Sequence, residues 1–550
     1  MISITVSNAT LILGAHTIFR DLSWEVQHDQ KIGLTGPNGA GKSSLFKLIT
    51  GEHTPEKGGA VIKAKGVTVG YLPQHPEFEP DQIAILLAMA GNPRVAEIDA
   101  ELHRIESRLG DPEVYDNAKR LERALDVQHR LLEEYESLGG MNYASRVREL
   151  LRGLGLPESD FEKPIRALSG GQKKLIGLAR LMLARPSVLL LDEPDNHLDM
   201  PGKAYLETLI NDYPGAVVII SHDRYLLDAC VTHVAEIEDG RITTFGGNYT
   251  EFIVDKEERL ARQEELYQIQ QREISRLEMA LNRYKQWVVL NDKFATRIHN
   301  MEARIERIET RSVERPILER RKMDLALNGW RGSNQVLELV GVSKSFPYPL
   351  STGAESQRCV LENVNFLIRH GERVGLIGAN GAGKSVLLRL VLGKEQPTTG
   401  EIKIGPSVKV GYYAQEQETL DFNQTLIDAV RMAGSMSEAN AVSFLIRYLF
   451  SYQQATQRIG SLSGGERSRL QLALLVLSGA NFLLLDEPTN NLDIASAEVL
   501  ENALYDFNGT VLVISHDRYF LDRTVKRIFA LEDGRISEHI GGYSDYAAKT

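Results

Sequence analysis

Apolar residues recur every three or four positions in two charged stretches of the chain, the pattern of helices that bury a single face. In residues 93–140 the apolar positions are Ile98, Leu102, Ile105 and Leu109, and then Leu121, Leu125, Leu132 and Tyr135. Gly139 and Gly140 end the second helix. Polar side chains dominate outside each seam, so the pattern favours a helical hairpin that projects from its domain. A helical subdomain that packs flat on its own core is the alternative.

The second stretch, residues 253–332, repeats the pattern on both sides of a short break. Its apolar positions are Ile274, Leu277, Leu281, Tyr284 and Val288 before the break, and Ile298, Met301, Ile305 and Ile308 after it. Two such seams joined by a short turn predict an antiparallel helical pair.

Elsewhere the apolar residues form short continuous runs, such as those in "SVLLLDEP" and "AVVIISHD", which are typical of buried strands. These runs are far shorter than the roughly 18 to 20 residues that a membrane-spanning helix needs. The N-terminal "MISITVSNAT" lacks the basic and apolar regions of a signal peptide. We therefore expect a cytoplasmic protein without a membrane segment.

The two halves of the chain resemble each other. "KIGLTGPNGAGKSSL" returns 342 residues later as "RVGLIGANGAGKSVL", whereas "LSGGQ", "LLLDEPDNHLD" and "SHDRYLLD" return after 294 residues as "LSGGE", "LLLDEPTNNLD" and "SHDRYFLD". The offset is 341 residues between Gln74 and Gln415, and its later fall to 294 locates about 47 extra residues in the first half, in the interval that contains the predicted hairpin. We therefore predict one domain at residues 1–252, with the hairpin at about 93–140 as an insertion, a helical linker at 253–332 and a second domain at 333–550.

Each half carries a "G-x-x-x-x-G-K-S" loop between an apolar run and a helical pattern, which is the context that a phosphate-binding loop requires. Its glycines let backbone N–H groups surround phosphates, its lysine adds a cation, and its serine can bind Mg²⁺. The candidate residues are Gly36, Asn38, Gly39, Gly41, Lys42, Ser43 and Ser44 in the first loop, and Gly378, Asn380, Gly381, Gly383, Lys384, Ser385 and Val386 in the second.

Two further motifs complete the predicted ATP chemistry. Asp192-Glu193 and Asp486-Glu487 end apolar strands, where one carboxylate can bind Mg²⁺ and its neighbour can activate water. The "LSGG" motifs place backbone donors at a helix start, where the helix dipole favours an anion. Their residues are Ser169, Gly170 and Gly171 in the first half, and Ser463, Gly464 and Gly465 in the second.

These motifs resemble those of the ATP-binding cassette superfamily, which implies an α/β fold of two tandem P-loop NTPase domains that hydrolyse ATP with Mg²⁺. The resemblance pairs Lys42 with Ser463 and Gly465 in one composite site, and Lys384 with Ser169 and Gly171 in the other. It matches Glu193 and Glu487 to catalytic bases, His222 and His516 to switch histidines, and Asp199 and Asp493 to D-loops. The implied Mg²⁺ ligands are Ser43, Gln74 and Asp192 in one site and Ser385, Gln415 and Asp486 in the other, where Gln74 and Gln415 match the Q-loops.

Two cassettes in one chain, an insertion in the first and a helical linker resemble the ABC-F family of ribosome-associated ATPases. The resemblance implies a monomer with intramolecular cassette pairing. It also implies binding at the ribosomal E site, with the linker toward P-site tRNA, rRNA and the peptidyl-transferase centre and the insertion as an arm toward the E-site side. Throttling, stall rescue, assembly and antibiotic protection all stay open as roles. An ATPase subunit for a separate membrane transporter, and a structural or DNA-repair ATPase, are the competing classes.

Two departures from the family pattern suggest unequal sites. Asp195 replaces the Thr that the second half has at Thr489. Phe346 fits the aromatic position that stacks on adenine, whereas the first half has Leu13 there, with Phe19 and His16 as possible substitutes.

Charge is distributed unevenly along the chain. The net charge is -11, yet residues 281–325 carry +4, and Arg304, Arg307, Arg311 and Arg315 form a basic stripe near Trp287 and Phe294. Arginine beside aromatic residues suits phosphates and unstacked bases. The alternative is a solvated face whose arginines pair with Glu302, Glu306 and Glu309. The two cysteines, Cys230 and Cys359, are too few for a metal or disulfide framework, and we expect buried apolar roles for both.

Overall fold

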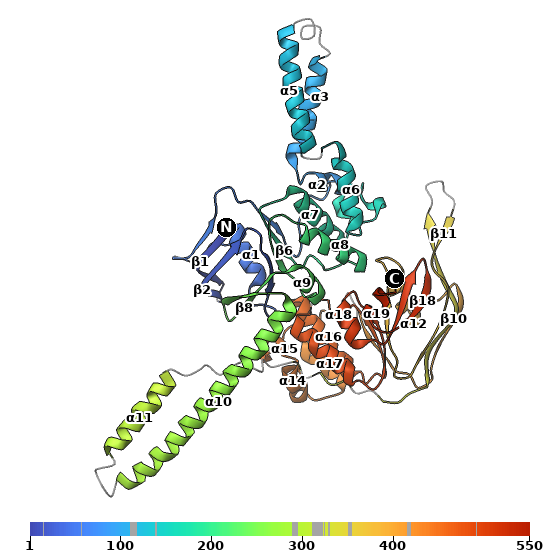
Figure 1. The fold of residues 1–550 in the computed structure, drawn as a ribbon. Coiled ribbons are helices and arrows are strands. Elements are labelled where there is room, and N and C mark those ends of the chain that lie inside the picture. Colours follow the sequence, from blue (N-terminus) through green and yellow to red (C-terminus); the bar gives the residue numbers. More distant parts are fainter. Residues whose placement is uncertain are drawn as a thin grey trace.

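The computed structural model describes residues 1–14, 16–56, 58–109, 118–137, 140–288, 295–310, 323, 325–327, 330–349, 355–414, 420–490 and 492–549. Two α/β cassettes lie side by side, and two helical hairpins project from them in different directions (Figure 1). Within the described residues, no helix is both long and apolar enough to cross a membrane.

The first cassette contains two sheets that enclose one core. An antiparallel sheet has the order β2-β1-β4, with β1 at Ile2–Leu13, β2 at His16–Gln27 and β4 at Ala60–Lys63. A six-stranded sheet has the order β5-β6-β7-β3-β8-β9, formed by Val69–Leu72, Val188–Asp192, Ala216–Ile220, Lys31–Thr35, His233–Glu238 and Arg241–Gly246. Every residue of β3, β6 and β7 is buried, as expected for parallel strands covered on both faces.

The second cassette repeats this topology, which confirms the predicted internal duplication. Its antiparallel sheet is β11-β10-β13, formed by Glu355–Arg369, Gln335–Pro349 and Thr399–Ile404. Its larger sheet is β14-β15-β16-β12-β17-β18, formed by Val410–Tyr413, Phe482–Asp486, Thr510–Ile514, Arg373–Ile377, Arg527–Glu532 and Arg535–Ile540. Cys230 is buried as predicted, but Cys359 is exposed, since it lies in the antiparallel sheet at the surface.

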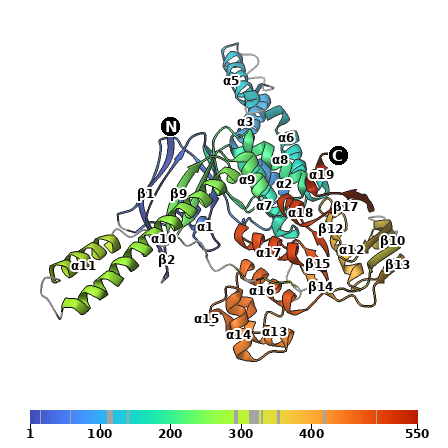
Figure 2. The same ribbon diagram turned by 60° about the horizontal axis from the view of Figure 1, so that its bottom comes forward.

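Matching helices flank the two large sheets. In the first cassette they are α1 (Lys42–Thr50), α7 (Gly170–Ala184), α8 (Met200–Asn211) and α9 (Arg224–Cys230), with α2 (Ala84–Met89) and α6 (Tyr143–Gly153) in a helical subdomain. In the second they are α12 (Lys384–Val391), α16 (Gly464–Leu477), α17 (Ile494–Asp506) and α18 (Arg518–Thr524), with α13 (Leu426–Gly434), α14 (Glu438–Arg447) and α15 (Tyr452–Ala455) as the subdomain and α19 (Tyr543–Ala547) at the end (Figure 2).

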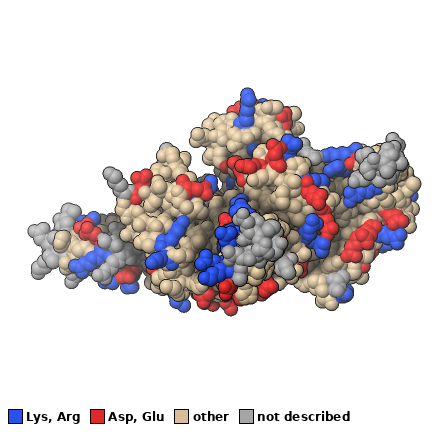
Figure 3. Space-filling view, turned by 90° about the horizontal axis from the view of Figure 1, so that it is seen from above, with Lys and Arg blue, Asp and Glu red and all other residues tan. Residues whose placement is uncertain are grey.

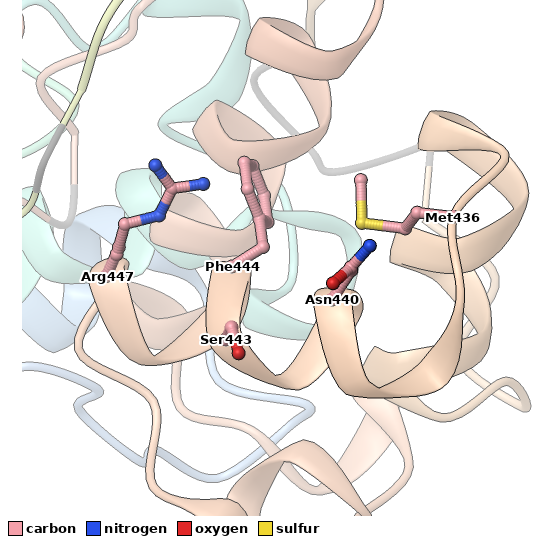
Figure 4. A pocket seen from close by; sticks show the side chains of 5 residues that line it. All are labelled: Met436, Asn440, Ser443, Phe444 and Arg447. Atoms are coloured by element: carbon pink, nitrogen blue, oxygen red, sulfur yellow. The ribbon is translucent and has the colours of Figure 1, made fainter.

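A surface hollow in the second helical subdomain lies away from the nucleotide motifs. Met436, Asn440, Ser443, Phe444 and Arg447 line it, and the Arg447 guanidinium lies 5.4 Å from the centre of the Phe444 ring (Figure 4). Because it contains no residue of the predicted ATP sites, we assign it no part in the chemistry.

The insertion forms the projecting hairpin that the sequence favours, from α3 (Pro93–Leu109) and α5 (Ala118–Ser137) (Figure 1). Ile98, Leu102 and Leu131 are buried between the helices, with Ile105 and Tyr135 partly buried. The predicted seam of the second helix was wrong at Leu125 and Leu132, which are exposed. The inward side of α5 includes Leu121, Ala124, Gln128, Leu131 and Tyr135, so a polar residue interrupts the apolar pattern.

The linker forms the predicted antiparallel pair, α10 (Tyr249–Val288) and α11 (Ala295–Thr310). Ile274, Leu281 and Ile305 are buried between them, as predicted. Helix α10 is continuous across residue 252, where we placed the domain boundary. The side chains of Tyr284, Trp287 and Val288, together with Phe294, Arg311 and Arg315, lie outside what the structure describes.

Candidate ATP sites

Both phosphate loops have the compact geometry that their glycines allow. Gly41 has a φ of 96°, and a Cβ added to it would lie 2.4 Å from Ile18 Cγ2, so only glycine fits there. The Lys42 ammonium donates to the carbonyl of Gly36 at 2.8 Å, and Lys384 donates to Gly378 at 2.7 Å. Burial lowers the pKa of both lysines. Each cation is thus held inside its own loop, at the start of α1 or α12.

The first strand-end aspartate is suited to a divalent cation. Asp192 is 2% exposed, and burial raises its pKa above the usual value. A hydrogen bond from Ser43 offsets part of this rise. Among the described residues, its Oδ2 has no hydrogen-bond partner. A buried carboxylate oxygen free of partners beside a serine hydroxyl fits the hard oxygen ligands that Mg²⁺ prefers.

The glutamates that follow occupy an unusual backbone conformation. Glu193 has a φ of 51° and Glu487 a φ of 49°, although each still donates its N–H to the neighbouring strand, at Ile220 and Ile514. The left-handed conformation is uncommon for residues other than glycine and is concentrated at functional sites. The positive φ turns the backbone at the end of the strand. The aspartate and the glutamate, although adjacent in sequence, therefore lie in different surroundings: Asp192 near Ser43 and Glu193 near His222.

A predicted switch histidine lies beside each glutamate. His222 Nε2 is 3.6 Å from Glu193 Oε1, and His516 Nε2 is 3.5 Å from Glu487 Oε1. Burial lowers the pKa of both histidines, most strongly for His516. Burial, with Asp486 next in effect, raises the pKa of Glu487 to about 7. Neutral imidazole beside a carboxylate suits acid–base work on water.

The two glutamates differ in their other partners. Glu193 Oε2 accepts from Gln74 at 2.8 Å and from Asn196 at 2.6 Å. Glu487 Oε2 accepts from the backbone N–H of His516 at 3.2 Å. Gln415, the predicted counterpart of Gln74, lies outside the described residues.

The predicted signature serines begin their helices. Ser169 caps α7 in a capping box with Gln172, and Ser463 caps α16 in one with Glu466. The backbone donors of Gly170, Gly171, Gly464 and Gly465 therefore lie in the first turns of these helices, where the dipole favours an anion.

Contacts between the cassettes link each phosphate loop to the other cassette. Asn380 N–H donates to Asp199 at 3.1 Å, and Asn38 N–H donates to Asp493 at 3.4 Å. These reciprocal contacts bring the two predicted D-loops to the opposite phosphate loops.

His197 makes a contact between the cassettes that no sequence motif predicted. Its carbonyl accepts from the Asn380 side chain at 2.9 Å, and a Cβ added to Gly171 would lie 2.9 Å from its Cβ. His197 therefore lies between the signature motif of the first cassette and the phosphate loop of the second. Its φ is 73°, and although it lies within the repeated "LLLDEPDNHLD" motif, the motif does not indicate this contact.

The adenine positions remain unequal. Phe346 is partly exposed on β10, with the Lys344 ammonium 4.9 Å from its ring centre. Leu13 is 38% exposed at the end of β1. Phe19 was a wrong substitute, because it is fully buried beneath Gly41 in the core. His16 stays a candidate, since it is exposed beside Leu13.

Comparison with known proteins agrees with this geometry. The family model described as "ABC transporter" matches residues 19–196 and 361–490, and a second model with the same description matches 235–326. "ABC transporter F family member 5" of Arabidopsis thaliana is 31% identical over 97% of this chain and 75% of its own length. The chain belongs to the ABC-F family. It is an ATPase with two tandem ATP-binding cassettes.

A second curated relative matches at a similar level, and a solved structure matches in fold. "Energy-dependent translational throttle protein EttA" of Haemophilus influenzae is 34% identical over 96% of this chain and 92% of its own length. The solved structure of "RNase-L Inhibitor" is similar in fold, with a TM-score of 0.61 at 18% identity over 99% of this chain and 93% of that one. The sequence similarity to these ABC-F relatives thus extends over the arm and the linker as well as the cassettes.

Proposed function

We propose that this ABC-F ATPase couples ATP binding and hydrolysis to ribosome binding, and that it thereby regulates or rescues translation. The name of its relative, an energy-dependent translational throttle protein, supports this proposal. The protein would occupy the E site, with its linker directed toward P-site tRNA and the peptidyl-transferase centre and its arm toward the E-site side. It would act as a monomer through intramolecular pairing of its cassettes.

Two composite ATP sites would form as the cassettes close head to tail. One would join Lys42 to the signature of α16, and the other would join Lys384 to the signature of α7. The crossed contacts of Asp199 and Asp493 with the phosphate loops support this pairing. In each site the glutamate would take a proton from the attacking water, while the histidine holds the carboxylate in place.

Mg²⁺, when bound, supplies charge neutralisation for the phosphates. Ser43, Gln74 and Asp192 would hold it in one site. Ser385, Gln415 and Asp486 would hold it in the other. The unpartnered Oδ2 of Asp192 supports the first of these assignments.

The attachment of α10 is the observation that carries the proposal. Tyr249 and Phe252, in its first turn, pack against a buried cluster of the first cassette, and Ile494 of the second cassette lies against the same cluster. Ile494 directly follows Asp493, which contacts the first phosphate loop. The root of the linker thus packs against the element that also contacts the first phosphate loop, so cassette closure would set the direction of the helical pair.

The RNA-contacting surface that we propose differs from the predicted stripe. Arg304 forms an ion pair with Glu273 of α10 at 2.6 Å, and Lys285 pairs with Glu302 at 2.8 Å, so part of the stripe joins the two helices. On α10, Arg272, Arg276 and Arg283 line a shallow hollow beside Met279, which is 68% exposed. We assign phosphate contact to this face of α10.

The face seen along the arm offers a contrast. Figure 3 shows Lys and Arg side chains there mixed with Asp and Glu and separated by uncharged surface. The described residues of this face therefore form no broad basic surface, and we do not expect it to attract RNA nonspecifically.

Co-sedimentation with ribosomes tests the proposal. Glu193→Gln with Glu487→Gln removes both bases but leaves the phosphate loops, so the double variant is expected to bind ATP, stop hydrolysing it and pellet with ribosomes in ATP. In ADP the same protein is expected to stay in the supernatant. Recovery with membranes instead of ribosomes would support the transporter alternative, and hydrolysis at the unmodified rate would refute the assignment of the bases.

A further inference from the structure

Two differences between the D-loop segments of the cassettes involve side chains whose charges act on each other, one just before helix α8 and one in its first turn. At the 294-residue offset, Asp195 and Lys203 of the first cassette correspond to Thr489 and Ala497 of the second. A carboxylate and an ammonium thus appear together in one half and are both missing from the other.

Lys203 lies at the centre of the cassette interface. Its side chain is 8% exposed, and its ammonium donates to Asp223 Oδ2 at 2.8 Å and to the backbone carbonyl of His516, in the second cassette, also at 2.8 Å. Asp195 is buried too, and its charge acts on Lys203. The lysine therefore joins Asp223 of its own cassette to the switch-histidine segment of the other, with the charge of Asp195 nearby.

The contacts around Lys203 are otherwise nearly symmetric. Arg518 forms an ion pair with Glu207 at 2.7 Å, and its counterpart Arg224 lies 3.4 Å from Glu501, the counterpart of Glu207. Asp517, the counterpart of Asp223, also lies close enough for the Lys203 charge to act on it. Lys203 breaks this symmetry, because Ala497 cannot donate to the carbonyl of His222.

We propose that Lys203 is a positioning residue that acts across the interface on the ATP site of Glu487. Its donation to the His516 carbonyl fixes the backbone whose N–H holds Glu487 at 3.2 Å and whose imidazole lies 3.5 Å from the same carboxylate. Ala497, the counterpart of the lysine, cannot give the Glu193 site this support. The two ATP sites therefore differ in how the catalytic glutamate is held, and Lys203 is the cause of this difference.

The physical basis is a desolvated charge-assisted hydrogen bond. A hydrogen bond from a buried ammonium is stronger than one between neutral groups, and Lys203 makes two. Removing the lysine alone would leave the buried Asp195 without the cation that acts on it, which is destabilising, whereas the charge of Arg518 also acts on Asp223. The informative change is therefore Asp195→Thr with Lys203→Ala, which gives the first cassette the pair found in the second.

Single-turnover ATP hydrolysis, measured for each site in isolation, tests the proposal. Glu193→Gln leaves only the Glu487 site, and Glu487→Gln leaves only the Glu193 site. We expect the paired change to slow hydrolysis roughly tenfold in the first background and by less than about threefold in the second. ATP affinity is expected to stay within about threefold in both.

A transfer variant separates positioning from a general loss of interface structure. Thr489→Asp and Ala497→Lys, added to the paired change, move the lysine to the second cassette. Hydrolysis at the Glu193 site, instead of the Glu487 site, is then expected to depend on it. Equal slowing in both backgrounds, or no slowing in either, would overturn the proposal. If the paired variant does not fold, Lys203→Arg keeps the charge but changes its geometry. It is expected to slow only the Glu487 site, and an equal effect on both sites would again contradict the proposal. The test uses no ribosomes, so its failure leaves the ribosome proposal untouched.

Discussion

At the scale of single residues, the two catalytic glutamates share a backbone conformation but not an environment. Both have a φ near 50°, yet Glu193 accepts from two side-chain amides, whereas Glu487 accepts from a backbone N–H and is almost fully buried. Burial raises the free energy of a carboxylate that is not paired with a cation. The Glu487 base should therefore respond to pH near neutrality.

The pKa of Glu487, raised to about 7, predicts a pH-dependent rate at its site. A base acts only when deprotonated, so its activity is lost as the pH falls through this pKa. In the Glu193→Gln variant, kcat/KM should rise with pH and level off above a midpoint near 7, because kcat/KM reports ionisations of the free enzyme. A profile that is flat between about pH 6 and pH 8 would contradict a buried, ionisable base.

Most site residues could be predicted from the sequence, because short motifs fix their local geometry. The phosphate-loop lysines, the strand-end carboxylates and the capping serines follow from spacing alone. His197 and Lys203 were missed for a different reason: their partners lie in the other cassette, about 180 and 310 residues away in sequence. Comparison of the halves at the 294-residue offset does mark Lys203, whose counterpart is Ala497.

At the scale of elements, the arm shows how far periodicity can predict a helix. The spacing predicted the hairpin and the inward side of α3, but it selected Leu132 instead of Leu131 on α5. Two adjacent leucines fit either register, and Gln128 on the inward side interrupts the pattern. Contact with α3 decides the register, and a single helix does not carry that information.

This register predicts different effects of two neighbouring substitutions. Leu131→Ala removes a side chain that is 7% exposed between α3 and α5, and should destabilise the hairpin by about 2 to 3 kcal/mol. Leu132→Ala, at a position that is 37% exposed, serves as the matched control and should cost less than about 1 kcal/mol. Hydrogen exchange of the arm amides measures both. Equal loss of protection would mean that the register is wrong.

The basic face of α10 predicts a salt-dependent role. Replacing Arg272, Arg276 and Arg283 by Ser should spare ATP hydrolysis without ribosomes, since these residues lie outside both sites. Ribosome binding should weaken, because fewer phosphates are neutralised. The log–log dependence of binding on salt should flatten by roughly 0.7 to 0.9 for each phosphate that the variant no longer neutralises.

The control for this prediction is the interhelical pair. Arg304→Ser should change ribosome affinity less than the triple variant, because Arg304 is paired with Glu273. Co-pelleting across a salt series compares the two. If Arg304→Ser weakened ribosome binding more than the triple variant did, the predicted stripe of α11 and not the face of α10 would be the RNA-contacting surface.

At the scale of the whole molecule, one interface joins the ATP sites to the linker. The D-loop contacts, Lys203 and the root of α10 all meet between α8, α9, α17 and α18, so packed side chains connect the ATP interface with the root of the linker. Internal duplication predicted the two cassettes, but it did not predict this convergence, because Ile494 of one cassette and the root of α10 meet only in the folded molecule.

The central claim, that cassette closure on ATP directs the linker into the ribosome, is tested most directly by a structure of the ribosome bound to the Glu193→Gln, Glu487→Gln variant in ATP. We predict a protein in the E site with both phosphate loops closed on the opposite signature motifs. The turn between α10 and α11 should lie beside P-site tRNA, with the basic face of α10 against RNA and the arm toward the E-site side. A complex in which the linker points into solvent, or in which the protein occupies another site, would contradict the claim.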